Sequence, residues 1–148
     1  MNAARYRHEQ RKPYVVLFAD GNRPAVVLDL RADAVRIALM DQQLREWMVG
    51  LFEVFPGDRL FLTAATYQTF RGHSDAFDLQ ETHYFHQDGT VVIKERHFQT
   101  GCAAPRAFTM DVSRTWEPDP TFGDYESILA LRWADKLRAA DRGSDIPA

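Results

Sequence analysis

Four strand-like segments follow one another in the second half of the chain with only short turns between them. They span residues 59–70, 77–87, 90–99 and 105–112, are rich in β-branched and aromatic residues, and are separated by Gly, Asp, Ser or Pro. Parallel strands require long crossover connections, usually helices, and no crossover helix fits between these segments. The sequence therefore predicts a largely antiparallel sheet.

The first half adds two apolar strands, at 14–19 and 25–30, joined by a turn of Asp, Gly, Asn, Arg and Pro. Residues 33–40 fit two structures, because their apolar residues alternate as in a strand but also match a helix beginning at Asp33. We favour the strand. A helix is predicted from the N-cap Asp41 to Pro56, since apolar residues recur at three-to-four-residue spacing: Leu44, Trp47, Met48, Leu51 and Phe55. A last helix is predicted over 125–140.

Together these elements predict an α+β domain with a curved sheet of about six to seven strands, open or barrel-like, one central helix and one C-terminal helix. The domain is expected to span residues 13–142. A flexible basic tail is expected at 1–12 and a second flexible tail at 143–148.

Composition excludes several classes of protein. The chain has 148 residues and a formal charge of -3, which argues against a nucleic-acid partner, since phosphate binding normally requires an excess of Lys and Arg. No apolar run approaches the roughly 20 residues of a membrane span, so we expect no membrane association and a cytoplasmic protein. No nucleotide or metalloprotease motif occurs, and we expect no cofactor.

Asp88 and Gly89 between two strand-like segments predict a hairpin with a two-residue loop. In that register Glu81 lies opposite Arg96, and His83 lies on the same face as both. Glu95 and His97 then lie on the other face together with His86. The three histidines are thus separated, which predicts no metal site.

Both faces of this hairpin nevertheless offer residues for general acid/base chemistry if the sheet encloses a cavity. The candidates are Glu81, His83 and Arg96 on one face, and Glu95 and His97 on the other. Neither set stands out, so the sequence favours a protein that is not an enzyme.

The segment 116–126 is acidic and aromatic and contains no basic residue. Its prolines stiffen the chain, and aromatic side chains among acids suit an interface. The candidate partner-binding residues are Trp116, Glu117, Asp119, Phe122, Asp124, Tyr125 and Glu126. In the alternative interpretation the aromatic residues close the core and the acids precede a helix N-terminus.

Two functions follow from these patterns. The first is a protein-binding module for a basic partner; small acidic bacterial immunity proteins, which block toxins, offer an analogy of size and charge. The second is a small-molecule-binding or catalytic site inside the curved sheet. A homodimer is compatible with either.

Overall fold

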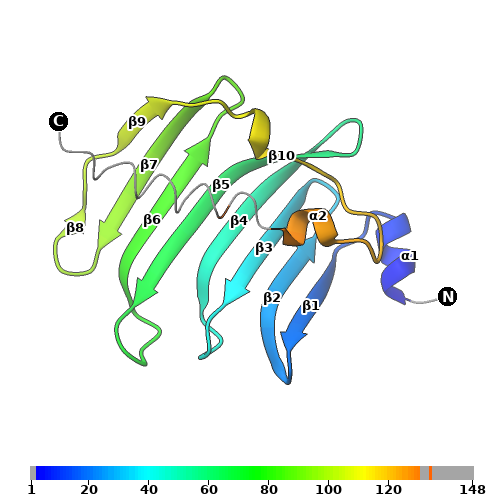
Figure 1. Cartoon of the computed structure of the whole chain (residues 1–148), viewed down its shortest axis with the longest axis horizontal. Coiled ribbons are helices and arrows are strands. Elements are labelled where there is room, and N and C mark those ends of the chain that lie inside the picture. Colours follow the sequence, from blue (N-terminus) through cyan, green and yellow to red (C-terminus); the bar gives the residue numbers. More distant parts are fainter. Residues whose placement is uncertain (1–2, 131–133, 135–148) are drawn as a thin grey trace.

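The computed structural model describes residues 3–130 and 134, and one antiparallel sheet dominates this part of the chain (Figure 1). Neighbouring strands follow the order β1-β2-β3-β4-β5-β6-β7-β8, while β9 also pairs with β7 and β10 with β5. Two helices, α1 (Ala3–Glu9) and α2 (Glu126–Leu129), and a 3-10 helix over Ser113–Thr115 lie outside the sheet. The strands are β1 (Tyr14–Asp20), β2 (Arg23–Leu30), β3 (Ala34–Met40), β4 (Glu46–Phe55), β5 (Arg59–Phe70), β6 (Phe77–Phe85), β7 (Thr90–His97), β8 (Gly101–Cys102), β9 (Arg106–Thr109) and β10 (Trp116–Pro118).

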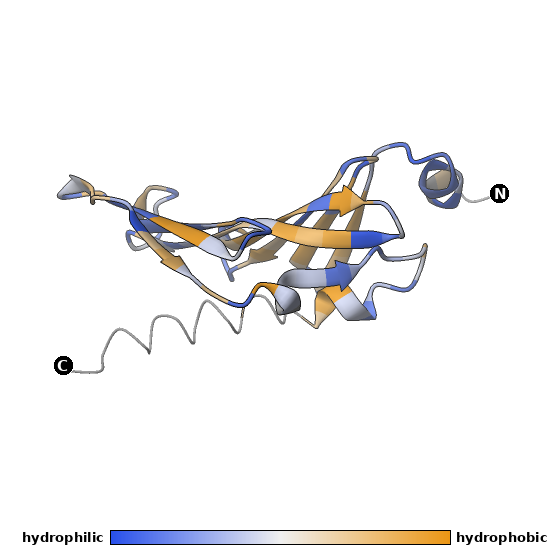
Figure 2. Ribbon diagram, turned by 90° about the horizontal axis from the view of Figure 1, so that it is seen from above, coloured by the Kyte–Doolittle hydropathy of each residue, from blue (hydrophilic) through white to orange (hydrophobic). Residues whose placement is uncertain are grey.

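The sheet is curved and open. Figure 2, turned by 90° from the first view, shows the bend of the strands, which do not meet in a barrel. One edge is β1, and the short strands β8 and β9 form the other. The predicted curved, largely antiparallel sheet is therefore confirmed, although the described part of the chain has more strands than the sequence predicted.

One face of the sheet, the inner face, carries the hydrophobic core. Alternate side chains of a strand point to the same side, and the segment that carries α2 crosses this side of the sheet (Figure 1). Tyr125 and Ile128 from this segment are buried against the strands. Complete burial of one large apolar side chain contributes about 1.5 to 3 kcal/mol. Among the largest buried side chains of the described residues are Leu28, Ile37, Met48, Phe52, Leu60 and Leu62.

Residues 41–45, predicted as the start of a central helix, instead form a turn. The Asp41 carboxylate accepts hydrogen bonds from the backbone N–H groups of Gln43 at 2.8 Å and Arg45 at 2.9 Å. Leu44 has a φ of 60°, in the left-handed region that an α-helix cannot contain. Asp41 thus closes a turn between β3 and β4 rather than capping a helix.

The remaining residues of the predicted helix form β4, so the predicted central helix is wrong. Met48 and Phe52 point into the core with Gly50 between them, while Leu51 is exposed on the opposite, outer face. The helical spacing of apolar residues was misleading because this strand carries apolar residues on both faces. Pairing with β3 and β5 on either side satisfies its backbone.

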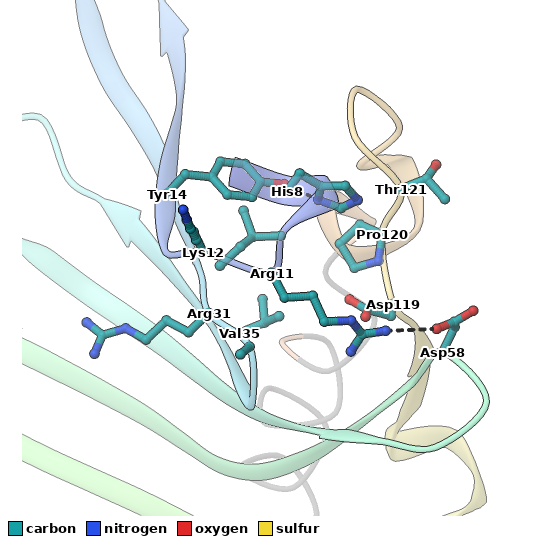
Figure 3. A pocket seen from close by; sticks show the side chains of 12 residues that line it. His8, Arg11, Lys12, Tyr14, Arg31, Val35, Asp58, Asp119, Pro120 and Thr121 are labelled. Carbon is teal, nitrogen blue, oxygen red and sulfur yellow. Dashed lines mark hydrogen bonds and ion pairs between the residues drawn. The ribbon is translucent and has the colours of Figure 1, made fainter. Parts of the chain in front are cut away.

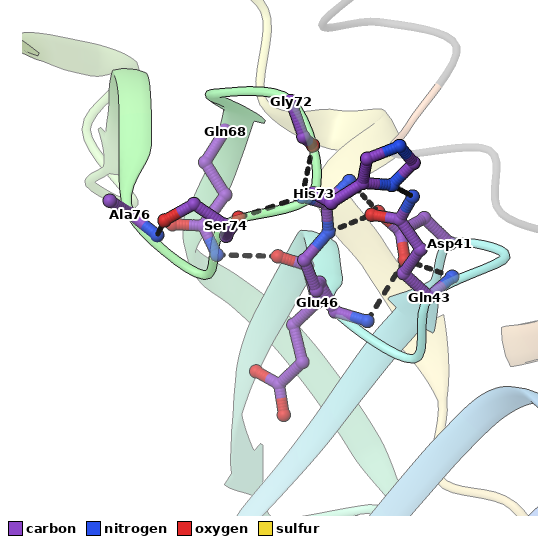
Figure 4. Close-up of polar contacts among 9 residues, drawn as sticks. Asp41, Gln43, Glu46, Gln68, Gly72, His73, Ser74 and Ala76 are labelled. Atoms are coloured by element: carbon purple, nitrogen blue, oxygen red, sulfur yellow. Dashed lines mark hydrogen bonds and ion pairs between the residues drawn. The ribbon is translucent and has the colours of Figure 1, made fainter.

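Arg45 connects the turn before β4 to the loop between β5 and β6 through hydrogen bonds to Asp41, Gly72 and Ser74. Figure 4 labels these three partners. Its Nη1 donates hydrogen bonds to the carbonyl oxygens of Gly72 and Ser74, each at 2.8 Å. Its Nε donates to the Asp41 carboxylate at 2.8 Å, and its guanidinium lies 4.3 Å from the centre of the Phe70 ring. This network is structural, since every donor in it serves the backbone or a neighbouring turn.

Other segments depart from the predictions in detail. Residues 33–40, for which two structures were considered, contain the strand β3, and only Arg106–Thr109 of the predicted strand 105–112 forms β9. Residues 3–9 of the segment expected to be a flexible tail form α1. Of the predicted helix 125–140 the structure describes α2, Ala130 and Ala134; the rest, and residues 143–148, lie outside the described residues.

Candidate functional site

The β6–β7 hairpin pairs one residue away from the predicted register. The backbone N–H of His86 donates to the carbonyl of Thr90 at 2.9 Å, so the loop contains three residues, 87–89, rather than two. Gly89 occupies the left-handed region with a φ of 92°, as the last residue of such loops commonly does. Because side chains alternate along a strand, a shift of one residue moves every side chain of β7 to the other face.

The corrected register gathers five charged or titratable residues on the inner face. Glu81 pairs with Glu95, and His83 and His97 lie on the same side. His83 Nε2 donates a hydrogen bond to Glu81, His97 Nε2 lies 3.3 Å from the Glu95 carboxylate, and Arg106 from β9 donates to the same carboxylate. Four of these residues were predicted candidates that the wrong register had divided between two faces. Sequence reasoning missed Arg106 because its pairing with β7 crosses a loop.

Arg96, predicted opposite Glu81, lies instead opposite Gln80 on the outer face, with its guanidinium 5.1 Å from the centre of the Phe77 ring. The predicted pair of Glu81 and Arg96 is therefore wrong. His83 and His97 share a face, contrary to prediction. In the described part of the chain, however, no three His, Cys, Asp or Glu side chains are arranged to hold a metal ion.

Within this cluster, hydrogen bonding favours the ionised form of Glu81. The hydrogen bond from His83 lowers the pKa of Glu81 below its usual value, against the opposing effect of partial burial. The His83 side chain is only 4% exposed. A histidine held by an ionised carboxylate suits general acid/base work, but such work also requires a cavity where a substrate can meet the ring. The cavity described below is lined by none of these residues.

The segment 116–126 contributes mostly to packing. The Trp116 ring lies 4.9 Å from that of Phe61, and Glu117 is buried and accepts a hydrogen bond from Ser127 at 3.0 Å. Tyr125 packs edge to face on Phe18. Of the remaining predicted partner-binding residues, Phe122 packs near Tyr14, Asp119 is half-buried, and Asp124 and Glu126 are exposed.

A cavity of about 200 Å³ lies where α1, the β2–β3 turn and the residues after β10 meet (Figure 3). Arg11 extends across it toward Asp58, with Asp119 beside the guanidinium. No sequence motif predicts this cavity, because its walls come from segments far apart in the chain. These segments include part of residues 1–12, which were expected to form a flexible tail. It is lined by His8, Arg11, Lys12, Tyr14, Leu30, Arg31, Ala32, Val35, Asp58, Asp119, Pro120 and Thr121.

The β1 edge of the sheet is a second surface that the sequence did not single out. Val15 and Leu17 point to the outer face and are 56% and 60% exposed. Val16 and Phe18 point to the inner face and are only partly buried. Between Tyr14 and Ala19 the strand has no charged residue.

The chain matches no protein-family model, no curated protein and no solved structure. Within the described residues, no helix has the length and apolar character needed to cross a membrane. Function must therefore be inferred from the surfaces and the cavity themselves.

Proposed function

We propose that this protein is a protein-binding module that adds an extended segment of its partner to the free edge of β1. The observation that carries the proposal is a mismatch between the sequence of β1 and its position. A continuous run of apolar, β-branched and aromatic residues is typical of a strand covered on both faces with neighbours on both sides. Among the described residues, β1 pairs with one neighbouring strand, β2.

The other edge shows how an edge strand without a partner is usually protected. Natural sheets blunt such edges with short strands, charged residues and proline. Strand β9 is four residues long, follows Pro105 and begins with Arg106. Strand β8 has two residues. Strand β1 follows Pro13 and ends at the charged Asp20, but it is seven residues long and has neither a charged residue nor a proline between Tyr14 and Ala19, so this stretch is suited to pairing.

The geometry of β1 defines the chemistry of the partner. Helix α1 lies beside the beginning of the strand (Figure 1), which leaves 15–20 as the accessible stretch. A partner segment of about six residues would pair through its backbone and place alternate apolar side chains against Leu17 on one face and Phe18 on the other. Asp20 is exposed at the end of this stretch and would attract a basic residue of the partner. A basic partner was also expected from the composition.

Site-specific photo-crosslinking in the native host tests the proposal. A benzophenone side chain at Leu17 should give one discrete adduct with a different protein. The same group at Phe98, which is 53% exposed and follows β7 near the opposite edge, should not give that adduct. Adding Asp20→Lys to the Leu17 probe should weaken crosslinking to a basic partner.

Binding can then be measured with the purified partner. Leu17→Lys should weaken it at least tenfold, about 1.4 kcal/mol, because the substituted charge would be desolvated against an apolar strand. Equal crosslinking at both probe positions would contradict the proposal. An adduct with twice the mass of the chain would show that β1 binds a second copy of this protein instead of a different protein.

A further inference from the structure

The cavity at the end of the sheet contains the carboxylate of Asp119, which lies beside the Arg11 guanidinium but is not hydrogen-bonded to it (Figure 3). Among the described residues, no hydrogen bond or ion pair reaches the Asp119 side chain, although its backbone N–H donates to the carbonyl of Asp58 at 2.8 Å. Partial burial raises the pKa of this carboxyl above its usual value. Asp41 offers a contrast, because its carboxylate accepts three hydrogen bonds from Gln43 and Arg45. The ionised Asp119 carboxylate therefore loses hydration free energy in the folded protein, and a cationic ligand would offset this loss.

Two cations at the same cavity have spare hydrogen-bond donors. Arg11 approaches Asp58 only to 3.6 Å, and these side chains are 62% and 81% exposed, so the pair is loose and contributes little. The Lys12 ammonium lies 5.2 Å from the centre of the Tyr6 ring and has no hydrogen bond or ion pair among the described residues. Arg31, by comparison, is hydrogen-bonded to Asp29 at 2.9 Å and points away from the cavity (Figure 3).

Apolar side chains and a hydroxyl form the rest of the wall. Leu30, Val35 and Pro120 are buried and provide an apolar surface. The Tyr14 hydroxyl lies 2.6 Å from His8 Nδ1, and burial raises the pKa of Tyr14, which keeps the hydroxyl protonated. The cavity thus combines a small apolar surface with charged and polar side chains, which in a small-molecule site fix the orientation of the ligand.

Backbone conformation adds a second indication at this cavity. In the described part of the chain three non-glycine residues have positive φ, and two of them, Arg11 at 51° and Asp58 at 53°, line the cavity. Such conformations cost free energy and cluster at functional sites. At Asp58 the positive φ belongs to the hairpin loop between β4 and β5, where Gly57 also has a positive φ.

We propose that this cavity binds a free amino acid with an apolar side chain, whose ammonium pairs with Asp119 and whose carboxylate pairs with Arg11 and Lys12. The apolar side chain lies against Leu30 and Val35. The volume of about 200 Å³ equals about seven waters at roughly 30 Å³ each, which suits a molecule of this size. The inference is independent of partner binding at β1, since it uses different residues.

Isothermal titration calorimetry with three matched probes tests this assignment. L-leucine carries both charges, isoamylamine lacks the carboxylate, and N-acetyl-L-leucine lacks the ammonium. L-leucine should bind, and each analogue should bind at least tenfold more weakly, since each leaves one charged group of the cavity without its partner. Absence of L-leucine binding, or equal binding of the three probes, would overturn the proposal.

Variants identify the groups responsible. Asp119→Asn, nearly isosteric, should weaken L-leucine binding at least tenfold and leave N-acetyl-L-leucine unaffected. Asp75→Asn, an exposed acid in the loop between β5 and β6, is the matched control and should leave L-leucine binding unchanged. Unchanged binding by a folded Asp119→Asn protein would overturn the assignment, whereas Leu17→Lys should leave the titration unaltered and so separates this site from the β1 surface.

Discussion

Replacing Gly89 by alanine should destabilise the protein through two separate effects. Gly89 has a φ of 92°, and a residue with a Cβ in the left-handed region costs about 1 to 2 kcal/mol. A Cβ built at Gly89 would also lie 2.8 Å from the carbonyl oxygen of Met110, a backbone atom that cannot easily move. Met110 is held there by the hydrogen bond that its N–H donates to the Gly89 carbonyl at 2.9 Å. Relief of such a clash adds about 1 to 3 kcal/mol.

Gly57 provides the matched control for this experiment. It lies in the hairpin loop between β4 and β5 with a φ of 82°, and a Cβ built there meets nothing within 4 Å. Gly57→Ala should therefore show the conformational cost alone, about 1 to 2 kcal/mol. Gly89→Ala should cost about 2 to 5 kcal/mol, which for a chain of 148 residues lowers Tm by about 2 to 4 °C for each kcal/mol.

Urea denaturation followed by circular dichroism measures both variants. A protein of this size typically unfolds with about 5 to 15 kcal/mol, so both variants should remain folded in water. The Met110 amide should also exchange with deuterium faster in Gly89→Ala than in Gly57→Ala. Equal destabilisation of the two variants, within about 0.5 kcal/mol, would refute the reasoning, because it would mean that the residues after β9 do not pack across the turn.

Three further predictions concern charged groups, all measured by urea denaturation. Burial raises the pKa of Asp119, so its ionised form opposes folding; Asp119→Asn should stabilise the protein at pH 7, and this gain should shrink as the pH falls through that pKa. Hydrogen bonding by His83 lowers the pKa of Glu81, so its contribution is present above the ordinary value of 4.5 and is lost as the pH falls through the lowered pKa; Glu81→Gln should destabilise at pH 7 and converge with the unsubstituted protein in acid. Arg45→Ala should cost about 2 to 3 kcal/mol because two loop carbonyls lose their donor, and Arg45→Lys should retain part of it.

Local sequence signals predicted the sheet well because its strands are long and separated by strong turn formers. These local signals gave the wrong structure where side-chain hydrogen bonds to distant segments, rather than local backbone preference, determine the conformation. At Asp41 a carboxylate suits both a helix N-cap and a closed turn, and the choice between them depends on Arg45 reaching the distant carbonyls of Gly72 and Ser74. No local pattern contains that contact.

In the hairpin between β6 and β7, an error of one residue in the predicted loop length changes which charged side chains share a face. Asp88 and Gly89 suit either a two-residue or a three-residue loop, and the sequence does not distinguish them. The longer loop is supported by residues after β9, since Met110 bonds to the Gly89 carbonyl. The difference of one residue decides whether Glu81 faces Arg96 or Glu95, and therefore whether the candidate acid/base residues are divided or assembled.

The arrangement of the core explains why both proposed functions lie at the margin of the sheet. The inner face buries its apolar residues against the α2 segment, so most of its area serves stability. In the described part of the chain, β1 is an edge strand, and the Asp119 carboxylate accepts no hydrogen bond where α1 meets the residues after β10. Because Leu17 lies on the outer face of β1 and Asp119 follows β10, substituting one should leave the function of the other intact. A variant at either position that abolished both crosslinking and leucine binding would show that the two surfaces act as one site.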